Sequence, residues 1–230
     1  FPGEVEGDLR ALTACNEVCG RRLVQLVDEL DMPDLGDLAS FILEASERGM
    51  RDAIRELPEG LYRHHMRIDG VDTPLDLHCA LQVRDGGIEI DFAGASPAVG
   101  RGVNVPMIYT EAMASFGVRS VIGGRIPNNA GSLAPVRVRA PEGCLLNAVR
   151  PAPVSARHII GQMIPDVVLG CLAQAAPERV PAEGASALWI LALSGGRADA
   201  QGDGRAFAVN AFHNGGTGAR PGKDGLSATA

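Results

Sequence analysis

The sequence predicts an α+β protein with an N-terminal helical hairpin, an antiparallel β meander, and then mixed helices and strands joined by glycine-rich loops. Apolar side chains up to Leu57 recur every three or four positions, which is typical of amphipathic helices. From Leu61 they alternate with polar side chains, which is typical of half-buried strands. We expect residues 1–230 to be an internal portion of a larger protein, with a possible division into a hairpin over 1–60 and an α+β core over 61–230.

Two helices are expected before residue 57. Pro33 restricts the residue before it and so ends the first helix, and Asp34 or Asp37 can cap the second. The short link between the helices favours an antiparallel hairpin. The first helix spans residues 8–30, and its apolar stripe consists of Leu9, Leu12, Cys15, Cys19, Leu23, Leu26, Val27 and Leu30.

Three strands are expected next, over residues 61–68, 75–83 and 87–92. The turns Asp69-Gly70 and Asp85-Gly86-Gly87 have the composition that β-hairpins favour, so the strands form a meander. The meander leads into the loop 91–106, which contains glycines, two prolines and an asparagine. Loops of this composition carry binding function on many rigid scaffolds, although an ordinary surface connection has the same composition.

The second half mixes helices and strands. A helix is expected over 106–122 and a short strand over 136–139. Ser155 is expected to cap an apolar helix over 156–176, which Pro165 should kink or split. Two further strands are expected over residues 185–193 and 205–212.

The composition excludes several classes of protein. A formal net charge of −7 and no clustered Lys and Arg argue against a nucleic-acid partner. No apolar run reaches the ~18 residues of a membrane span, and the first residues do not resemble a signal peptide. The five cysteines include no CxxC pair and lie in apolar patterns, so we expect reduced, buried thiols in a cytoplasmic protein. Cys15 and Cys19 have a helical spacing that can hold a metal, but no His or further Cys is near them in sequence.

Three irregular segments, 91–106, 123–135 and 213–225, combine glycine with Asn, Asp or His. Such segments can build a site for a carbonyl or an oxyanion. The alternative is that their polar residues only form turns, since asparagine tolerates left-handed backbone. The asparagines concerned are Asn104, Asn128, Asn129 and Asn214.

Among the five histidines, His158 and His213 are the better acid–base candidates, because one begins an apolar helix and the other adjoins a glycine pair. We expect His64, His65 and His78, which lie in strands, to be solvated or satisfied structurally. Neither HExxH, GxSxG nor GxGxxG occurs, so the sequence contains no self-contained hydrolase or nucleotide motif.

Six motifs follow one another along the chain: GDLRALTACNEVCGRRLVQL, SERGMRDAIRELPEGLY, DFAGASPAVGRGVNVP, IPNNAGSLAPVRVRAPEGCLLN, RPAPVSARH and HNGGTGARPGKDG. In this order they resemble the hydantoinase B family, which includes parts of 5-oxoprolinase and of acetone and acetophenone carboxylases. The resemblance covers essentially the whole chain.

The resemblance implies a B component of an ATP-dependent cyclic-amide hydrolase acting on hydantoin, N-methylhydantoin or 5-oxoproline. It implies a hydantoinase A-like ATPase partner that carries ATP, a homo-oligomeric or heteromeric assembly, and a divalent metal held by residues upstream of Phe1. This chain would then bind no cofactor and be inactive alone. Pocket-lining roles are implied for Asp91, Asn104, Asn128, His158 and Asp224.

A second reading belongs to another class of function. In it, the chain is an assembly or docking module of a related ATP-dependent ketone carboxylase, and the chemistry is supplied by other residues. Sequence alone does not choose between hydrolysis and carboxylation, because both need an activated carbonyl kept from bulk water.

Overall fold

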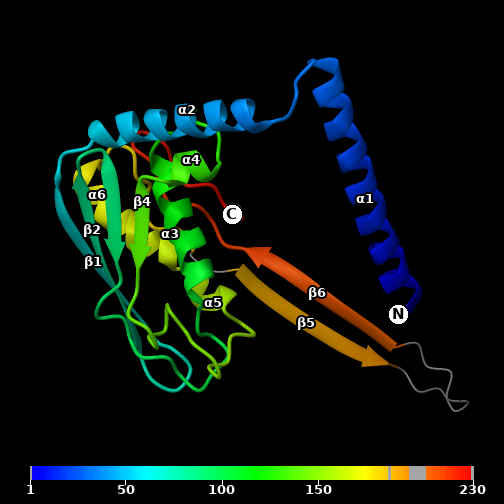
Figure 1. Cartoon of the computed structure of the whole chain (residues 1–230). Helices are drawn as coiled ribbons and strands as arrows, with labels where there is room; N and C mark the ends of the chain where they lie inside the picture. The colour runs from blue at the N-terminus through cyan, green and yellow to red at the C-terminus, as the bar shows by residue number, and fades with distance from the viewer. Residues whose placement is uncertain (1, 186–187, 197–205, 229–230) are drawn as a thin grey trace, which may run out of the picture. The chain divides into compact units, whose positions relative to one another are not determined.

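A computed structural model describes residues 2–185, 188–196 and 206–228 (Figure 1). The chain divides into two compact units, residues 1–45 and 46–230, and the boundary falls inside the helix α2 (Gly36–Arg55). Among the described residues, no helix combines the length and the apolar character that crossing a membrane requires.

The first unit contains α1 (Pro2–Glu29) and the N-terminal half of α2. Both expected helices are present, and α1 begins at Pro2 rather than at Asp8. A side-chain oxygen of Asp34 accepts a hydrogen bond of 2.7 Å from the Gly36 amide, at the start of α2 as expected. The apolar residues of α1 are largely exposed, so the expectation of buried thiols is wrong for Cys15 and Cys19.

The second unit contains a four-stranded sheet with the order β1-β2-β3-β4. The first three strands pair antiparallel and confirm the meander. The β2–β3 connection is a two-residue turn in which Asp85 and Gly86 have φ of 53° and 69°, the left-handed backbone that tight hairpins need. The strands are β1 (Gly60–Ile68), β2 (Leu75–Arg84), β3 (Gly87–Asp91) and β4 (Val136–Arg139).

The strand β4 pairs parallel to β3, so the chain must cross over between them. This crossover contains α3 (Met107–Val121) and α4 (Ala130–Leu133). The chain continues into α5 (His158–Gly161) and α6 (Ile164–Ala175). In Figure 1, α6 lies against β1 and β2, and α3 packs on α6 and β4.

Pro165 splits the apolar helix, as expected, because it lies in the first turn of α6 where its missing N–H costs nothing. The expectation that Ser155 caps this helix is wrong. The residue before α5 is Arg157, and its side chain makes no capping hydrogen bond. Ser155 instead packs against Gly102 of the loop 91–106, where a Cβ would meet its Oγ.

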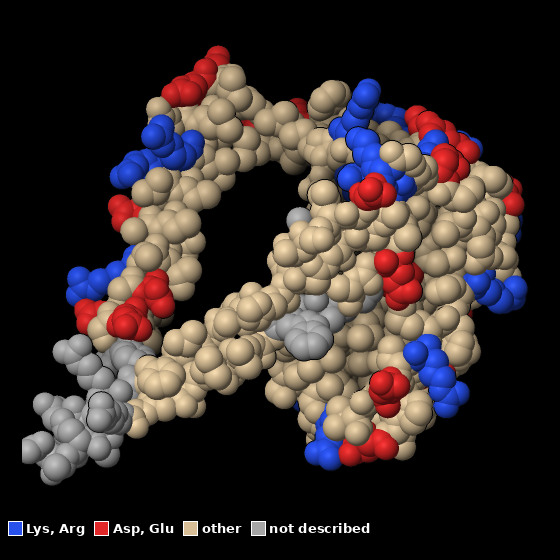
Figure 2. Space-filling view, turned by 180° about the vertical axis from the view of Figure 1, so that it is seen from behind, with Lys and Arg blue, Asp and Glu red and all other residues tan. Residues whose placement is uncertain are grey.

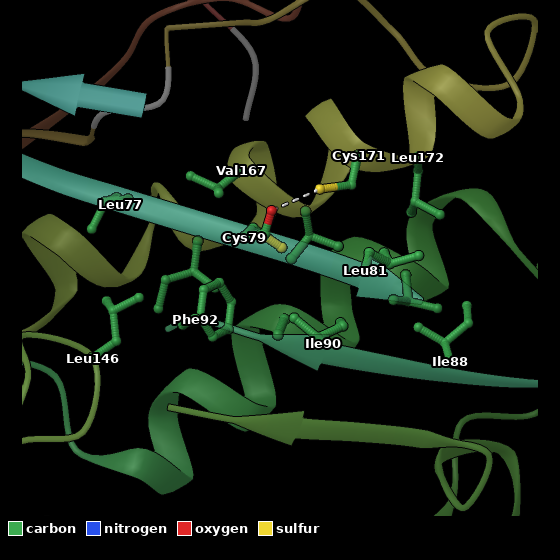
Figure 3. Packing of buried hydrophobic residues seen from close by; sticks show 14 of the residues in the cluster. Leu77, Cys79, Leu81, Ile88, Ile90, Phe92, Leu146, Val167, Cys171 and Leu172 are labelled. Carbon is green, nitrogen blue, oxygen red and sulfur yellow. Dashed lines mark hydrogen bonds between the residues drawn. The ribbon is translucent and has the colours of Figure 1, made fainter. Parts of the chain in front are cut away.

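The core lies on one face of the sheet. Alternate residues of β2 and β3 point inward and share one cluster with residues of α3 and α6, and Figure 3 shows Leu77, Leu81 and Ile90 in this cluster. The Cys171 thiol lies 3.5 Å from the Cys79 carbonyl oxygen. The neighbouring Cys171 thiol and burial raise the pKa of the Cys79 thiol, so this buried thiol stays protonated.

A separate two-stranded sheet pairs β5 (Leu188–Gly196) antiparallel with β6 (Ala206–Asn214), close to the expected ranges. Neither strand contains Lys, Arg, Asp or Glu, and Figure 2 shows this hairpin free of acidic and basic colour. Leu191, Leu193, Phe207 and Val209 are on one face of the hairpin and are all exposed. Exposed apolar side chains grouped on one face of a two-stranded sheet are typical of an interaction surface.

Candidate functional site

The loop 91–106 is held by backbone hydrogen bonds to a distant segment, 143–148. The Val105 amide donates to the Leu145 carbonyl at 2.8 Å, and the Leu145 amide donates to the Ser96 carbonyl at 2.8 Å. The Ala98 amide donates to the Gly143 carbonyl at 3.0 Å. Because both of its arms are paired in this way, the loop is a fixed part of the second unit.

Asn104 lies fully buried at the centre of this loop. Its Oδ1 accepts a hydrogen bond from the Val99 amide at 2.7 Å. Its Nδ2 lies 2.8–2.9 Å from the carbonyl oxygens of Val99, Arg101 and Pro153. These contacts occupy both the oxygen and the nitrogen of the side-chain amide. Asn104 can therefore affect the binding of a molecule nearby by fixing the shape of the loop.

The loop is also tied to the β1–β2 connection by an ion pair. Arg101 donates from Nε and Nη2 to the two carboxylate oxygens of Asp72, both at 2.8 Å. The hydrogen bonds from Arg101 lower the pKa of Asp72 below its usual value. Both side chains are more than half exposed, so this pair positions the loop rather than contributing much stability.

The polar face of the sheet brings together three side chains, His65, Asp76 and His78, to which the sequence assigns no catalytic role. His65 and His78 are opposite each other on β1 and β2, and their rings stack with centroids 4.3 Å apart. The Nε2 atom of His65 lies 2.9 Å from Oδ1 of Asp76, and this contact lowers the pKa of the Asp76 carboxyl. A carboxylate that orients an imidazole is the usual arrangement of a general base.

This histidine pair adjoins the loop. Asp76 and Ser96 exchange two hydrogen bonds: the Asp76 amide donates to Ser96 Oγ at 2.8 Å, and the Ser96 amide donates to the Asp76 carbonyl at 2.9 Å. Gly94 lies over the His78 ring with a φ of 92°, a backbone conformation that side chains disfavour. The candidate site is therefore the polar sheet face next to the loop 91–106.

Asp91 lies where β3 enters the loop, on the same polar face. Its Oδ1 accepts a hydrogen bond of 2.8 Å from the Ala93 amide and so shapes the first turn of the loop. Its Oδ2 lies 3.5 Å from Nη2 of Arg139 on β4. Asp91 is thus the one expected site residue that the structure places on the candidate surface itself.

Asn128 is exposed and lines a cavity of about 870 Å³ between α3 and β4. We call this cavity the α3–β4 groove; its lining also includes Ile108, Phe116, Val136, Val138 and Arg139. Asn129, the neighbour of Asn128, has a structural task instead. Its Oδ1 accepts from the Ser132 amide at 3.1 Å to cap α4, and its Nδ2 donates to Ser46 at 2.9 Å.

The other two expected site residues lie elsewhere. His158 is half-buried and is the first residue of α5. Asp224 is exposed in the segment after β6, next to an isolated bridge between Arg220 and Lys223. Among the described residues, no hydrogen bond or ion pair joins any of the five expected side chains to another.

The described ranges contain no metal centre. Within them, no three His, Cys, Asp or Glu side chains gather as the ligands of a metal ion do. The residues that the structure describes therefore do not fit a metal ion.

Comparison with known proteins gives a family match over the entire chain. A family model described as "Hydantoinase B/oxoprolinase" matches residues 1–230. The provisionally named B component of a D-/L-hydantoinase from Pseudomonas sp. (strain NS671) is 30% identical over 99% of this chain and 40% of its own length. The beta component of the caprolactamase from Pseudomonas jessenii is 29% identical over 77% of this chain and 31% of its own length.

Solved structures share the fold. The ATP-dependent caprolactamase from Pseudomonas jessenii superposes with a TM-score of 0.82 and 24% identity, over 97% of this chain and 39% of that one. A nucleotide-free acetone carboxylase has a TM-score of 0.68 and 21% identity, over 80% of this chain and 27% of that one. The chain thus spans less than half the length of the relatives it matches.

Proposed function

Because the chain belongs to the hydantoinase B/oxoprolinase family, we propose that it forms part of the B component of an ATP-dependent cyclic-amide hydrolase. The observation that carries the proposal is the family match from residue 1 to residue 230. The relatives' names support it, since hydantoin, 5-oxoproline and caprolactam are all cyclic amides. The proposed substrate is a ring of the hydantoin, N-methylhydantoin or 5-oxoproline type.

The proposed chemistry divides between two components. A cyclic amide resists water because of amide resonance, and ATP supplies the energy to activate its oxygen. A hydantoinase A-like partner would bind the nucleotide, and the B component would open the activated ring in a site kept from bulk water. The names of two relatives support a partner of this kind, because each designates one component of a larger enzyme, B in one and beta in the other.

On this chain, we assign the ring-facing surface to the polar sheet face beside the loop 91–106. Asp91 lies on that face, and the His65–Asp76 contact of 2.9 Å supplies a candidate general base there. Asn104 would act by shaping the loop. Asn128, His158 and Asp224 are proposed as residues of neighbouring surfaces that the complete site includes.

A second candidate function is assembly, as a docking module of the hydrolase or of a related ATP-dependent ketone carboxylase. The apolar residues of α1 and of the β5–β6 hairpin favour it, because large side chains on both are exposed. For example, Leu12 of α1 is 63% exposed and Phe212 of β6 is 61% exposed, far more than core residues of a closed domain.

The experiment that tests the proposal uses the full protein that carries this sequence, together with an A-like component. Ring opening of hydantoin, N-methylhydantoin and 5-oxoproline is followed with and without ATP. We expect ATP-dependent ring opening of at least one substrate. We expect His65→Ala to reduce kcat by about 10²-fold or more while the complex elutes unchanged from a sizing column.

Arg63→Ala is the matched control, because Arg63 is exposed on the same face of β1 two residues away. An unchanged kcat for His65→Ala would remove the assignment of this surface. ATP-dependent carboxylation of a ketone, with no ring opening of any of the three cyclic amides, would favour the carboxylase reading instead. Turnover by residues 1–230 alone would contradict the expectation that this chain is inactive without its partner.

A further inference from the structure

The strand β4 is the last strand of its sheet, and one of its edges has no partner strand among the described residues. On the β3 side, the Ile88 amide donates to the Pro135 carbonyl at 2.9 Å. The Phe92 amide donates to the Arg139 carbonyl, also at 2.9 Å. Because backbone groups of a parallel strand alternate in direction, Val136 and Val138 direct their N–H and C=O groups to the free edge. The edge therefore offers the backbone donors and acceptors of both valines to another strand.

The apolar layer of the unit continues beyond this edge. Ile108, Ala112 and Phe116 recur every four residues along α3 and all line the α3–β4 groove. Ile108 is 75% exposed and Phe116 is 60% exposed. A strand added to β4 would lie over this stripe and cover it, just as β4 itself lies over α3.

The charges on the polar side of β4 select the kind of strand. Arg139 faces Asp91 at 3.5 Å and Glu89 at 3.8 Å on β3. Arg137 is exposed and forms no ion pair with any residue that the structure describes. The strand β3 has the sequence Ile-Glu-Ile-Asp, which places apolar residues inward and acids opposite the arginines.

At its paired edge, β4 therefore already binds a strand, β3, in which apolar and acidic residues alternate. The free edge carries the same two arginines and a similar apolar floor. A second copy of β4 is a poor occupant, because its own Val-Arg-Val-Arg pattern would bring arginines opposite arginines.

We propose that the α3–β4 groove binds a β-strand of a partner chain in which apolar and acidic residues alternate, by addition to the free edge of β4. Its apolar residues cover Ile108 and Phe116, and its acids face Arg137. The inference does not depend on which ring the enzyme opens.

The probe is a synthetic peptide that copies residues 87–92, acetyl-Gly-Ile-Glu-Ile-Asp-Phe-amide, titrated into the isotope-labelled 230-residue chain. We expect the amide resonances of Val136 and Val138 to shift and their hydrogen exchange to slow. A peptide with both acids replaced by lysine should bind about tenfold more weakly, because favourable charge pairs become unfavourable.

Charge reversal gives the sharper test. Arg137→Glu should weaken the acidic peptide and strengthen the lysine peptide, each by several-fold. Phe116→Ala should also weaken the acidic peptide by about tenfold, through lost apolar contact. Phe212→Ala is the matched control, because Phe212 is equally exposed, at 61%, but lies on β6 outside the groove.

Several outcomes would overturn the proposal. They are equal binding of the two peptides, resonance shifts that map to β1 instead of β4, and a Phe212→Ala effect as large as that of Phe116→Ala. Protection of Val136 and Val138 without peptide, in a chain that sediments as a dimer, would identify a second copy as the occupant. Absence of any peptide binding would also count against the proposal.

Discussion

Asn104 and Pro153, which are 49 residues apart in sequence, are joined by a hydrogen bond of 2.8 Å from the asparagine Nδ2 to the proline carbonyl. The same amide group reaches two further carbonyls inside the loop 91–106. A single buried side chain therefore fixes the loop internally and attaches it to the segment before α5. Since proline has no amide N–H, its carbonyl is its only backbone group able to make such a bond.

Replacing Asn104 with alanine should destabilise the protein by about 2–4 kcal/mol, because the Val99 amide and three carbonyls lose a buried partner. Urea unfolding measures this change. Asn128→Ala is the matched control, since Asn128 is exposed, and it should change stability by less than about 0.5 kcal/mol. Equal effects of the two substitutions would contradict the role assigned to Asn104.

The Asp72–Arg101 pair should make the order of the loop depend on acid pH. The pKa of Asp72 is lower in the folded protein, so the contribution of the pair is complete above the usual carboxyl pKa of about 3.9 and is lost as the pH falls through the lower folded value. Amide exchange at residues 99–104, corrected for intrinsic rates, should show this loss. Asp72→Asn should abolish the step, whereas Asp69→Asn, at an exposed neighbour, should preserve it.

Gly170 permits the close approach of α6 to β1, because a Cβ there would overlap the His64 ring. Gly170→Ala should therefore destabilise the protein by about 1–3 kcal/mol in denaturant unfolding. Adding His64→Ala should recover part of this loss, giving a coupling energy in a double-mutant cycle. Gly100→Ala, where nothing lies within 4 Å of an added Cβ, should be nearly neutral. If the effects of Gly170→Ala and His64→Ala on the free energy of unfolding were strictly additive, the contact between these two residues would not limit the approach of α6 to β1.

The five thiols should separate into two classes. Cys15 and Cys19 are exposed on α1, whereas Cys79, Cys144 and Cys171 are buried and burial raises the pKa of Cys144. An aromatic disulfide reagent at neutral pH should therefore titrate two thiols quickly and three more only in denaturant. A third fast thiol in the native protein would contradict the packing of the core.

Periodicity predicted most elements of this fold, because each has a strong local signal. The turn at Asp85 and Gly86 is one example, since its two residues specify both the hairpin and its register. The partner of β4 had no such signal. Its Val-Arg-Val-Arg pattern fits either edge and either direction, so only the packing of α3 decides that it pairs parallel to β3.

The site was harder to predict, for a related reason. Asn104 and Asn128 both lie in glycine-rich segments, and Asn104 is the buried one because its side chain bonds the backbone of Val99, Arg101 and the distant Pro153. The stacking of His65 on His78 depends on the β1–β2 register. The connection between these strands is too long to fix that register, so no local pattern indicated that the two histidines meet.

The parallel pairing of β3 with β4 has a consequence for the order in which the chain folds. The hairpin contacts of β1, β2 and β3 close short loops, whereas β4 can join only after the whole of 92–135 has found its path. The sheet should therefore grow from the meander, with β4 added last. In kinetic terms, substitutions at Val136 or Val138 should speed unfolding and leave the folding rate nearly unchanged, which stopped-flow measurements in denaturant would check.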